Sequence, residues 1–345
     1  MHAQGFIRSV WMRALIAAGA LLLTGVQAAV PAQPSVQTMI EAMTRANAAV
    51  VGVEVTAVEA ARSARTLGRE RSGSGVAIGA DGLVLTIGYL IVEAETIQLV
   101  TQDERRIPAT TVAYDQATGF GLVKPLLALR GVTPVVLGSY QDSRAGEPLM
   151  VASGGDDAGV AMTQLVSKRA FTGYWEYHID AALFTSPPVR NHSGAALFNQ
   201  RGELLGIGSL VVADAAGNSP RVAGNMFVPV DLLKPVLAEM QKTGSTRQSH
   251  RPWLGVTSSE RDGRVHVVRV TDDSPAQAGG VAPGDVILAV DGARVTTLEE
   301  FYKRVWSHPR PDDEIKLTVQ QGEQVRELTL RGVDRSTTMV KPQGI

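Results

Sequence analysis

The stretch "GSGVAIGADGLVLTI", residues 73–87, decides the fold class. Two aliphatic runs flank a turn of glycine and aspartate, which is typical of strand, turn and strand. Similar short runs follow up to about Val230, among them "TIQLV", "EPLMVAS" and "GELLGIGSLVV". Many short strands separated by turn signals predict an all-β barrel or sandwich, and they argue against alternating β–α units.

Helical spacing is confined to a few segments. Residues 35–47 carry apolar side chains at helical intervals and predict an amphipathic helix that leads into a strand at 49–55. The segment "DLLKPVLAEM", residues 231–240, predicts a second helix with Asp231 at its N-cap. The polar segment 241–250 that follows has no apolar period and predicts a linker between two domains.

The N-terminal residues have the pattern of an export signal. Two arginines, Arg8 and Arg13, precede an apolar run, and Val26-Gln27-Ala28 supplies the small residues that a signal peptidase reads. Residues 1–28 are therefore predicted to be a signal peptide, which places the mature protein in the periplasm without membrane contact. The alternative is an uncleaved anchor, because the apolar run extended to Val30 is just long enough to cross a bilayer.

Composition narrows the chemistry. Lys and Arg total 33 against 34 Asp and Glu, so the near-neutral chain offers no basic footprint for nucleic acid. There is no cysteine, which excludes disulfides and thiolate metal sites. The six histidines show no metal-ligand spacing. We therefore expect neither a metal nor a cofactor.

The C-terminal part, residues 251–333, is predicted to be a compact domain, and the polar residues 334–345 a flexible tail. Its stretch "SPAQAGGVAPGDVILAVDGARVTTLEEF", residues 274–301, closely resembles the centre of a bacterial PDZ domain. The resemblance implies that "WLGV" is the loop that binds a peptide carboxylate and that the helix 297–306 forms the other wall of a groove. The implied peptide-binding residues are Trp253, Leu254, Gly255, Val256, Leu298, Phe301 and Tyr302. Their spacing on the helix equally suits core packing.

Upstream blocks are similar to trypsin-like proteases of the HtrA/DegP type. They are "GSGVAIGADGLVLT", "YDQATGFGLVK" and "NHSGAALFNQRGELLGIGS", in the family's order. Together with the PDZ match, the resemblance covers nearly all of the mature chain. It implies a chymotrypsin-like double β-barrel over residues 35–240, with the active site in the cleft between the barrels, followed by the PDZ domain.

At the catalytic positions the resemblance breaks down. Ser193 falls on the nucleophile of the family pattern, but Tyr89 stands where the family has its histidine and Gly119 where it has its aspartate. Asn191 replaces the glycine two residues before the serine, in the loop that shapes the oxyanion hole. Two of the three triad members are therefore missing.

This loss removes the proton acceptor. A serine hydroxyl attacks only when a base takes its proton, and a tyrosine with an ordinary pKa of about 10 stays protonated at neutral pH. Three other residues are candidates for the missing proton acceptor. His192 is interpreted as a loop histidine, His178 as a packed or surface residue, and Asp115 as a turn residue. Tyr89 is expected to be a core aromatic in the apolar strand "LVLTIGYLIV".

The sequence predicts an exported HtrA-like pseudo-protease that binds C-terminal peptides or unfolded proteins through its PDZ domain, in envelope protein quality control or regulation. One alternative is an active serine endopeptidase in which an unconventional base activates Ser193. Another is a regulatory subunit that forms mixed oligomers with an active homologue. The resemblance also implies a homotrimer as an assembly of this chain. Enzymatic activity is left open at this point, with the inactive state favoured.

Overall fold

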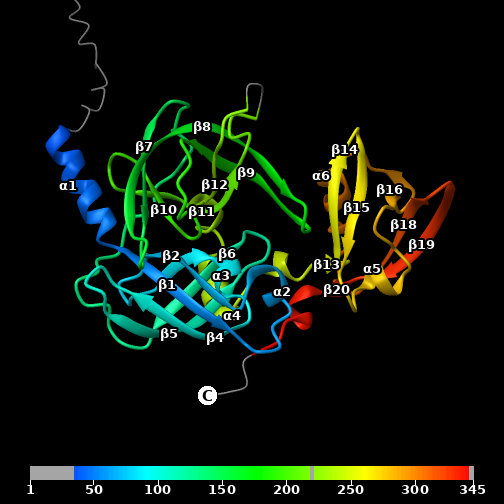
Figure 1. The fold of residues 1–345 in the computed structure, drawn as a ribbon, viewed down its shortest axis with the longest axis horizontal. Coiled ribbons are helices and arrows are strands. Elements are labelled where there is room, and N and C mark those ends of the chain that lie inside the picture. Colours follow the sequence, from blue (N-terminus) through cyan, green and yellow to red (C-terminus); the bar gives the residue numbers. More distant parts are fainter. Residues whose placement is uncertain (1–34, 218–220, 342–345) are drawn as a thin grey trace, which may run out of the picture. The chain divides into compact units, whose positions relative to one another are not determined.

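The computed structural model describes residues 35–217 and 221–341. Its ribbon contains two closed β-barrels and a separate C-terminal sheet (Figure 1). The fold is mainly β, as the sequence predicted, with a trypsin-like double barrel followed by a PDZ domain. The predicted signal peptide, residues 1–28, lies outside the described residues. No helix within 35–217 and 221–341 is long and apolar enough to cross a membrane.

Six strands close each barrel. The first contains β1 (Val50–Ala57), β2 (Glu70–Ala77), β3 (Val84–Ile87), β4 (Ala94–Val100), β5 (Arg106–Tyr114) and β6 (Phe120–Pro125), in the order β1-β2-β3-β6-β5-β4. The second contains β7 (Pro148–Ser153), β8 (Gly159–Gly173), β9 (Tyr177–Ser186), β10 (Ala196–Phe198), β11 (Leu204–Val212) and β12 (Gly224–Pro229), in the order β10-β11-β12-β9-β8-β7. All the pairings are antiparallel.

A large apolar cluster reaches from the first barrel into the second, and a smaller cluster lies in the second barrel alone. Short strands such as β3 are buried along their whole length, which explains why they read as unbroken aliphatic runs. Val53 and Phe120 of the first barrel belong to the same buried cluster as Phe198 and Ile207 of the second. Helix α1 (Val36–Asn47), capped by the Ser35 side chain, agrees with the helix expected at 35–47 and buries Ala42 and Ala46.

The C-terminal domain is a sheet with two short helices. Its strands are β14 (Val256–Arg261), β15 (Arg264–Val270), β16 (Val286–Val290), β17 (Ala293–Arg294), β18 (Glu314–Gln321) and β19 (Gln324–Arg331), and its helices are α5 (Pro275–Ala278) and α6 (Leu298–Val305). The main path through the sheet runs β14-β15-β16-β18-β19, which leaves β14 at an edge. Thr297 caps α6 by accepting the N–H of Glu300, within one residue of the expected helix 297–306.

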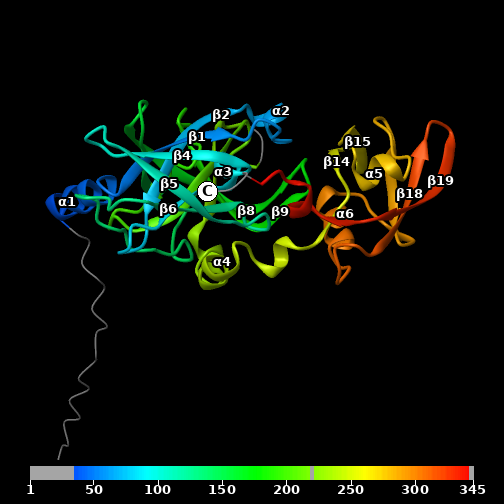
Figure 2. The same cartoon turned by 90° about the horizontal axis from the view of Figure 1, so that it is seen from below.

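The segment predicted as a linker, residues 241–250, is more ordered than its polar sequence indicates. Helix α4 (Leu237–Thr243) continues into it, and a 3₁₀ turn, η2 (Arg247–Ser249), follows. Figure 2 shows α4 and the segment that leads from it toward β14. Thr246 and Ser249 are buried because their side chains donate hydrogen bonds to the carboxylate of Asp115.

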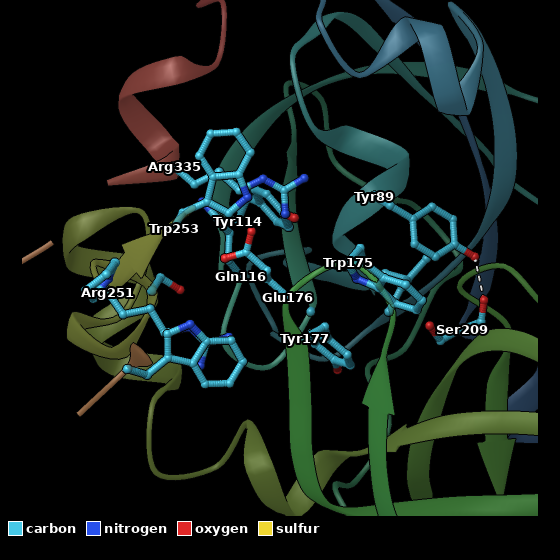
Figure 3. A pocket seen from close by; sticks show the side chains of 15 residues that line it. Tyr89, Tyr114, Gln116, Trp175, Glu176, Tyr177, Ser209, Arg251, Trp253 and Arg335 are labelled. Carbon is cyan, nitrogen blue, oxygen red and sulfur yellow. Dashed lines mark hydrogen bonds between the residues drawn. The ribbon is translucent and has the colours of Figure 1, made fainter. Parts of the chain in front are cut away.

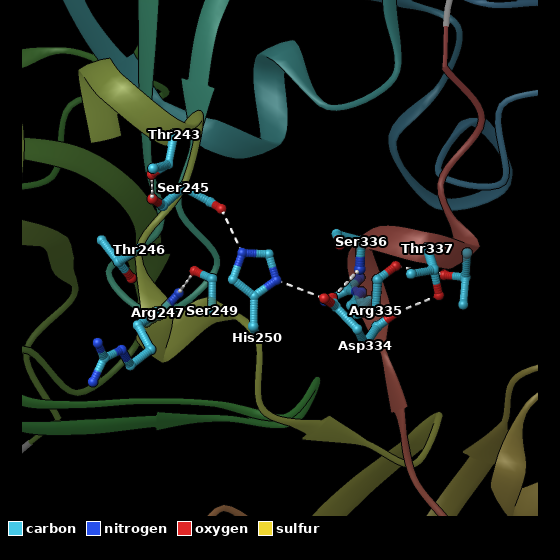
Figure 4. A network of polar contacts seen from close by, with 12 residues as sticks. Thr243, Ser245, Thr246, Arg247, Ser249, His250, Asp334, Arg335, Ser336 and Thr337 are labelled. Carbon is cyan, nitrogen blue, oxygen red and sulfur yellow. Dashed lines mark hydrogen bonds and ion pairs between the residues drawn. The ribbon is translucent and has the colours of Figure 1, made fainter. Parts of the chain in front are cut away.

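The predicted flexible tail, residues 334–345, is also structured as far as Lys341. Strand β20 (Val333–Asp334) pairs with β13 (Pro252–Trp253), and the 3₁₀ turn η3 (Arg335–Thr338) follows. The Asp334 carboxylate lies 2.5 Å from His250 Nδ1 and also accepts the N–H of Ser336 (Figure 4). These polar side chains take part in contacts between segments that lie far apart in the chain.

Two further local predictions need correction. The helix expected at 231–240 begins only at Leu237, after the 3₁₀ turn η1 (Val230–Leu232). Asp231 caps no helix, since its carboxylate accepts hydrogen bonds from Ser139 Oγ and Tyr140 N–H. Tyr89 does not lie in a strand, because β3 ends at Ile87 and the short helix α3 (Gly88–Ile91) carries the tyrosine.

Candidate active site and peptide-binding groove

Ser193 lies in the loop before β10, and the following glycine fixes the shape of that loop. Gly194 has a φ of 73°, in the left-handed region that favours glycine. A Cβ at this position would lie 2.0 Å from the carbonyl oxygen of Ser74. The carbonyl of Ser193 in turn accepts the N–H of Ser74 at 2.8 Å. The loop is thus tied to β2, and the framework that holds a nucleophile is intact.

The Tyr89 hydroxyl is hydrogen-bonded to the hydroxyl of Ser193. Its hydroxyl donates to Ser193 Oγ at 2.8 Å and lies 3.0 Å from the carbonyl oxygen of Ser209, a contact drawn in Figure 3. Burial raises the pKa of Tyr89 to about 12, against the smaller lowering effect of the bond to Ser193. The phenol is therefore protonated at neutral pH, and it acts as a hydrogen-bond donor toward the serine.

Gly119 has a backbone that a catalytic aspartate could adopt only with strain. Its φ is 84°, and a Cβ there would lie 3.1 Å from the Tyr177 hydroxyl. That hydroxyl donates to the carbonyl of Thr118 at 2.7 Å, so Tyr177 occupies the space beside Gly119. Its own pKa is raised by burial. Restoring an acid at 119 would consequently require Tyr177 to move.

Asn191 turns away from the serine. Its side-chain amide donates to the carbonyl of Asp157 at 2.8 Å. Asn191 is not among the described residues with positive φ, so the asparagine does not use the left-handed backbone that a glycine there could adopt. This substitution leaves the loop in place but changes the conformations open to the N–H groups of an oxyanion hole.

None of the three candidate substitute acceptors is hydrogen-bonded to Ser193. His192 Nδ1 lies 2.8 Å from the carbonyl oxygen of Arg190 in its own loop. His178 is buried between Thr172 and Asp180. Asp115 is fully buried in the turn between β5 and β6, where it accepts hydrogen bonds from the linker. Within residues 35–217 and 221–341, no imidazole or carboxylate bonds to the Ser193 hydroxyl.

A group of potential metal ligands lies elsewhere. His178, Asp180 and Glu299 bring ligand atoms within 4.8 Å of one another, a grouping that the histidine spacing did not indicate. Lys303 Nζ lies 2.9 Å from Asp180 Oδ1 and 2.8 Å from Glu299 Oε1. An ammonium group already supplies the positive charge there, so we interpret the group as an ion-pair cluster.

The loop expected to bind a peptide carboxylate does hold a carboxylate, that of Glu176. Glu176 Oε1 accepts the N–H of Gly255 at 2.7 Å and that of Val256 at 2.9 Å, and Oε2 accepts the N–H of Leu254 at 3.0 Å. Gly255 has a φ of 85°, and a Cβ there would lie 2.3 Å from Ser274 Cβ. Only glycine fits this turn, which aims three consecutive N–H groups at one acceptor.

The apolar residues predicted to line the groove are mostly part of the domain core. Leu254, Val256, Leu298, Phe301 and Tyr302 are all buried and belong to one cluster. Burial raises the pKa of the Tyr302 phenol, whose oxygen has no hydrogen-bond partner among the described residues. Trp253 instead pairs with Val333 in the two-stranded sheet. A role in peptide binding remains a prediction for all of these side chains.

Sequence reasoning missed several residues that surround both sites. Glu176, Arg251 and Arg335 line a cavity of about 60 Å³ (Figure 3). Tyr89 and Trp253 form other parts of its wall. Burial lowers the pKa of Arg251 to about 10 and raises that of Glu176, the latter against the N–H donors of the loop and the charge of Arg335. The aromatic-rich stretch around Glu176 was the available signal, but Glu176 contacts a loop 78 to 80 residues further along the chain.

Comparisons with known proteins agree with this architecture. The trypsin-like peptidase domain family matches residues 73–207, and the PDZ domain family matches residues 252–331. The fold and the order of domains therefore define a trypsin-like protease domain followed by a PDZ domain.

Individual relatives are distant. A probable periplasmic serine endoprotease, DegP-like, of Pseudomonas fluorescens is 26% identical over 233 residues, 64% of this chain and 47% of the relative. The serine endoprotease DegS of Haemophilus influenzae is 23% identical over 250 residues, 72% of both chains. The solved HtrA-type protease AlgW with decapeptide has a TM-score of 0.54 at 20% identity, covering 88% of this chain and 99% of that one. The chain spans about half the length of several curated relatives that it matches. Over most of its length the chain is similar to HtrA-type proteases.

Proposed function

We propose that this HtrA-like chain binds peptides or unfolded proteins through its PDZ domain and does not hydrolyse them. The observation that carries the proposal is the edge strand β14, which continues from the three N–H groups of Leu254, Gly255 and Val256. An extended peptide can add to such an edge as a further strand while the loop holds its terminal carboxylate. AlgW, a structural neighbour, was solved with a decapeptide, which is consistent with this mode.

Loss of hydrolysis is the second part of the proposal. Tyr89 offers Ser193 a proton where catalysis needs an acceptor, and Gly119 offers no group that could orient a base. The cell envelope is the proposed location, since relatives are described as periplasmic. Protein quality control or regulation in that compartment would use binding alone.

The first test is peptide binding to the full chain. A decapeptide with a free C-terminal carboxylate is expected to bind, and the same peptide with a C-terminal amide is expected to bind at least about tenfold more weakly. Calorimetry with peptide up to about 1 mM covers the range of weak PDZ complexes. Equal binding of acid and amide would exclude the carboxylate loop as the site.

Gly255→Ala should abolish the carboxylate-dependent part of this binding, because the added methyl group meets Ser274 and the left-handed backbone is strained. Gly280→Ala is the matched control. Gly280 also has a left-handed φ, 82°, but nothing lies within 4 Å of its added Cβ. The control is expected to retain binding within about threefold, and its loss would assign the effect to general destabilisation.

A further inference from the structure

The tip of the β8–β9 hairpin lies on the PDZ loop in the manner of a bound peptide end. The carboxylate of Glu176 accepts the three consecutive N–H groups of Leu254, Gly255 and Val256 at 2.7–3.0 Å. Glu176 is only 7% exposed, so the loop amides are shielded from solvent ligands by the hairpin. In the proposed function, the C-terminal carboxylate of a bound peptide accepts these same three N–H groups.

A second contact extends the likeness from the loop to the strand. The carbonyl of Tyr174 accepts the N–H of Ser258 on the edge strand β14 at 2.9 Å. Tyr174 precedes Glu176 by two residues, and Ser258 follows Val256 by two. The hairpin tip therefore contacts the edge of β14 through one backbone hydrogen bond in addition to the Glu176 side chain. The hairpin tip occupies the edge to which an added strand would pair.

Glu176 has an unfavourable backbone conformation, and the contact of its side chain with the PDZ loop explains why a glutamate occupies this position. Residues 174–176 form a three-residue loop between β8 and β9, and Glu176 has a φ of 57°. Glycine is favoured at the left-handed position that ends such loops, and a glutamate there is strained. The hairpin itself gains nothing from glutamate at this position, whereas the PDZ loop gains a buried acceptor.

The other wall of the groove is also engaged by the hairpin. Lys303 of α6 lies 2.9 Å from Asp180 of β9, and His178 of β9 lies 3.8 Å from Glu299 of α6. These contacts are more exposed than those of Glu176, so each of them stabilises the docked hairpin less than the Glu176 contacts do. Both β14 and α6 therefore contact β8–β9.

We propose that Glu176 is an internal competitor of C-terminal peptides, and that a ligand must displace the β8–β9 hairpin tip to bind. The inference rests on the proposed peptide-binding function and concerns the regulation of the same site. The apparent affinity for a peptide is then its intrinsic affinity multiplied by the fraction of molecules in which the loop is open. Removing the competitor strengthens binding without creating any contact to the ligand.

The test uses the full chain and fluorescein-labelled decapeptides that end in valine, leucine or phenylalanine, each as free acid and as amide. Glu176→Gly removes the carboxylate and relieves the strained backbone, so it is expected to fold. Its dissociation constant for the free acids should be at least about tenfold lower than that of the unmodified protein in fluorescence anisotropy. Glu176→Gln, which keeps a neutral acceptor, should lie between the two.

Asp180→Ala is the matched control, because it removes another acidic contact from the same hairpin but leaves Glu176 in the loop. It is expected to change the dissociation constant by less than about threefold. Equal tightening in Asp180→Ala and Glu176→Gly would overturn the specific role of Glu176 in favour of general loosening of the hairpin.

Two outcomes separate this inference from the proposed function. Carboxylate-dependent binding with the same affinity in Glu176→Gly and the unmodified protein would overturn the competition and leave the proposed function standing. No binding by any variant would overturn both. Hydrogen exchange at the amides of residues 254–256 checks the contact without a peptide, and it should be faster in Glu176→Gly than in Asp180→Ala.

Discussion

The purified protein is expected to cleave casein about a million-fold more slowly than a trypsin-like protease with an intact triad, and Ser193→Ala should leave that rate unchanged. The reason is the geometry around the hydroxyl. Tyr89 donates a hydrogen bond to Ser193 Oγ, and its raised pKa, about 12, keeps it protonated. A serine whose proton no neighbouring base can take remains a weak nucleophile.

The measurement is the release of dye from labelled casein over hours, with trypsin as the positive control. Turnover that disappears in Ser193→Ala would contradict the account and establish the endopeptidase alternative. Tyr89→His alone is expected to restore little, because Gly119 supplies nothing that orients the imidazole. Gly119→Asp should be poorly tolerated, since its φ of 84° and the nearby Tyr177 hydroxyl leave no relaxed place for the side chain.

Asp115→Asn is expected to lower the free energy of unfolding of the protease domain by about 3 kcal/mol, a shift of roughly 6–10 °C in Tm. The two oxygens of Asp115 accept hydrogen bonds from the side chains of Thr118, Thr246 and Ser249 and from two backbone N–H groups. An amide replaces one of these acceptors by a donor, which leaves buried donors unpaired. Thermal unfolding followed by tryptophan fluorescence measures the change.

The contribution of Asp115 should depend on pH with a defined sign. Burial alone would raise its pKa, but the hydrogen bonds from Ser249, Thr118 and Thr246 together lower it below the ordinary value of about 4. A depressed pKa in the folded state means that the stabilisation is complete above the unfolded-state pKa and is lost as pH falls through the folded-state value. The difference in Tm between the protein and Asp115→Asn should therefore shrink only below about pH 4. Exposed Asp142→Asn is the control, with an expected change within about 0.5 kcal/mol.

The sequence predicted those parts of the fold that depend on local pattern. Short aliphatic runs and turn residues indicated many of the barrel strands, and the helix 297–306 differs from α6 by one residue at each end. What failed were the segments governed by distant contacts. Asp231 looked like a helix cap but bonds to Ser139. Nothing in the polar residues 241–250 indicated that Thr246 and Ser249 are buried against Asp115. No periodicity within a segment reveals such a partner.

The candidate site was predicted to a similar extent. The sequence motifs placed Tyr89 at the histidine position and Ser193 at the serine position of a catalytic triad. In the structure, their side-chain oxygens lie 2.8 Å apart. The bond between them required the fold, because Tyr89 lies in the short helix α3 rather than in the expected apolar strand. Glu176 could not have been assigned to the PDZ loop from sequence, since it lies in the other domain, at the tip of a protease-domain hairpin.

The most direct test of the central claim is covalent labelling of Ser193. A fluorophosphonate probe reacts with a serine whose proton is taken by a neighbouring base. The described residues place no such base beside Ser193. After incubation at neutral pH, intact-mass spectrometry should show the unmodified protein, while trypsin in the same tube is fully labelled. An adduct mapped to Ser193 and absent from Ser193→Ala would contradict the account.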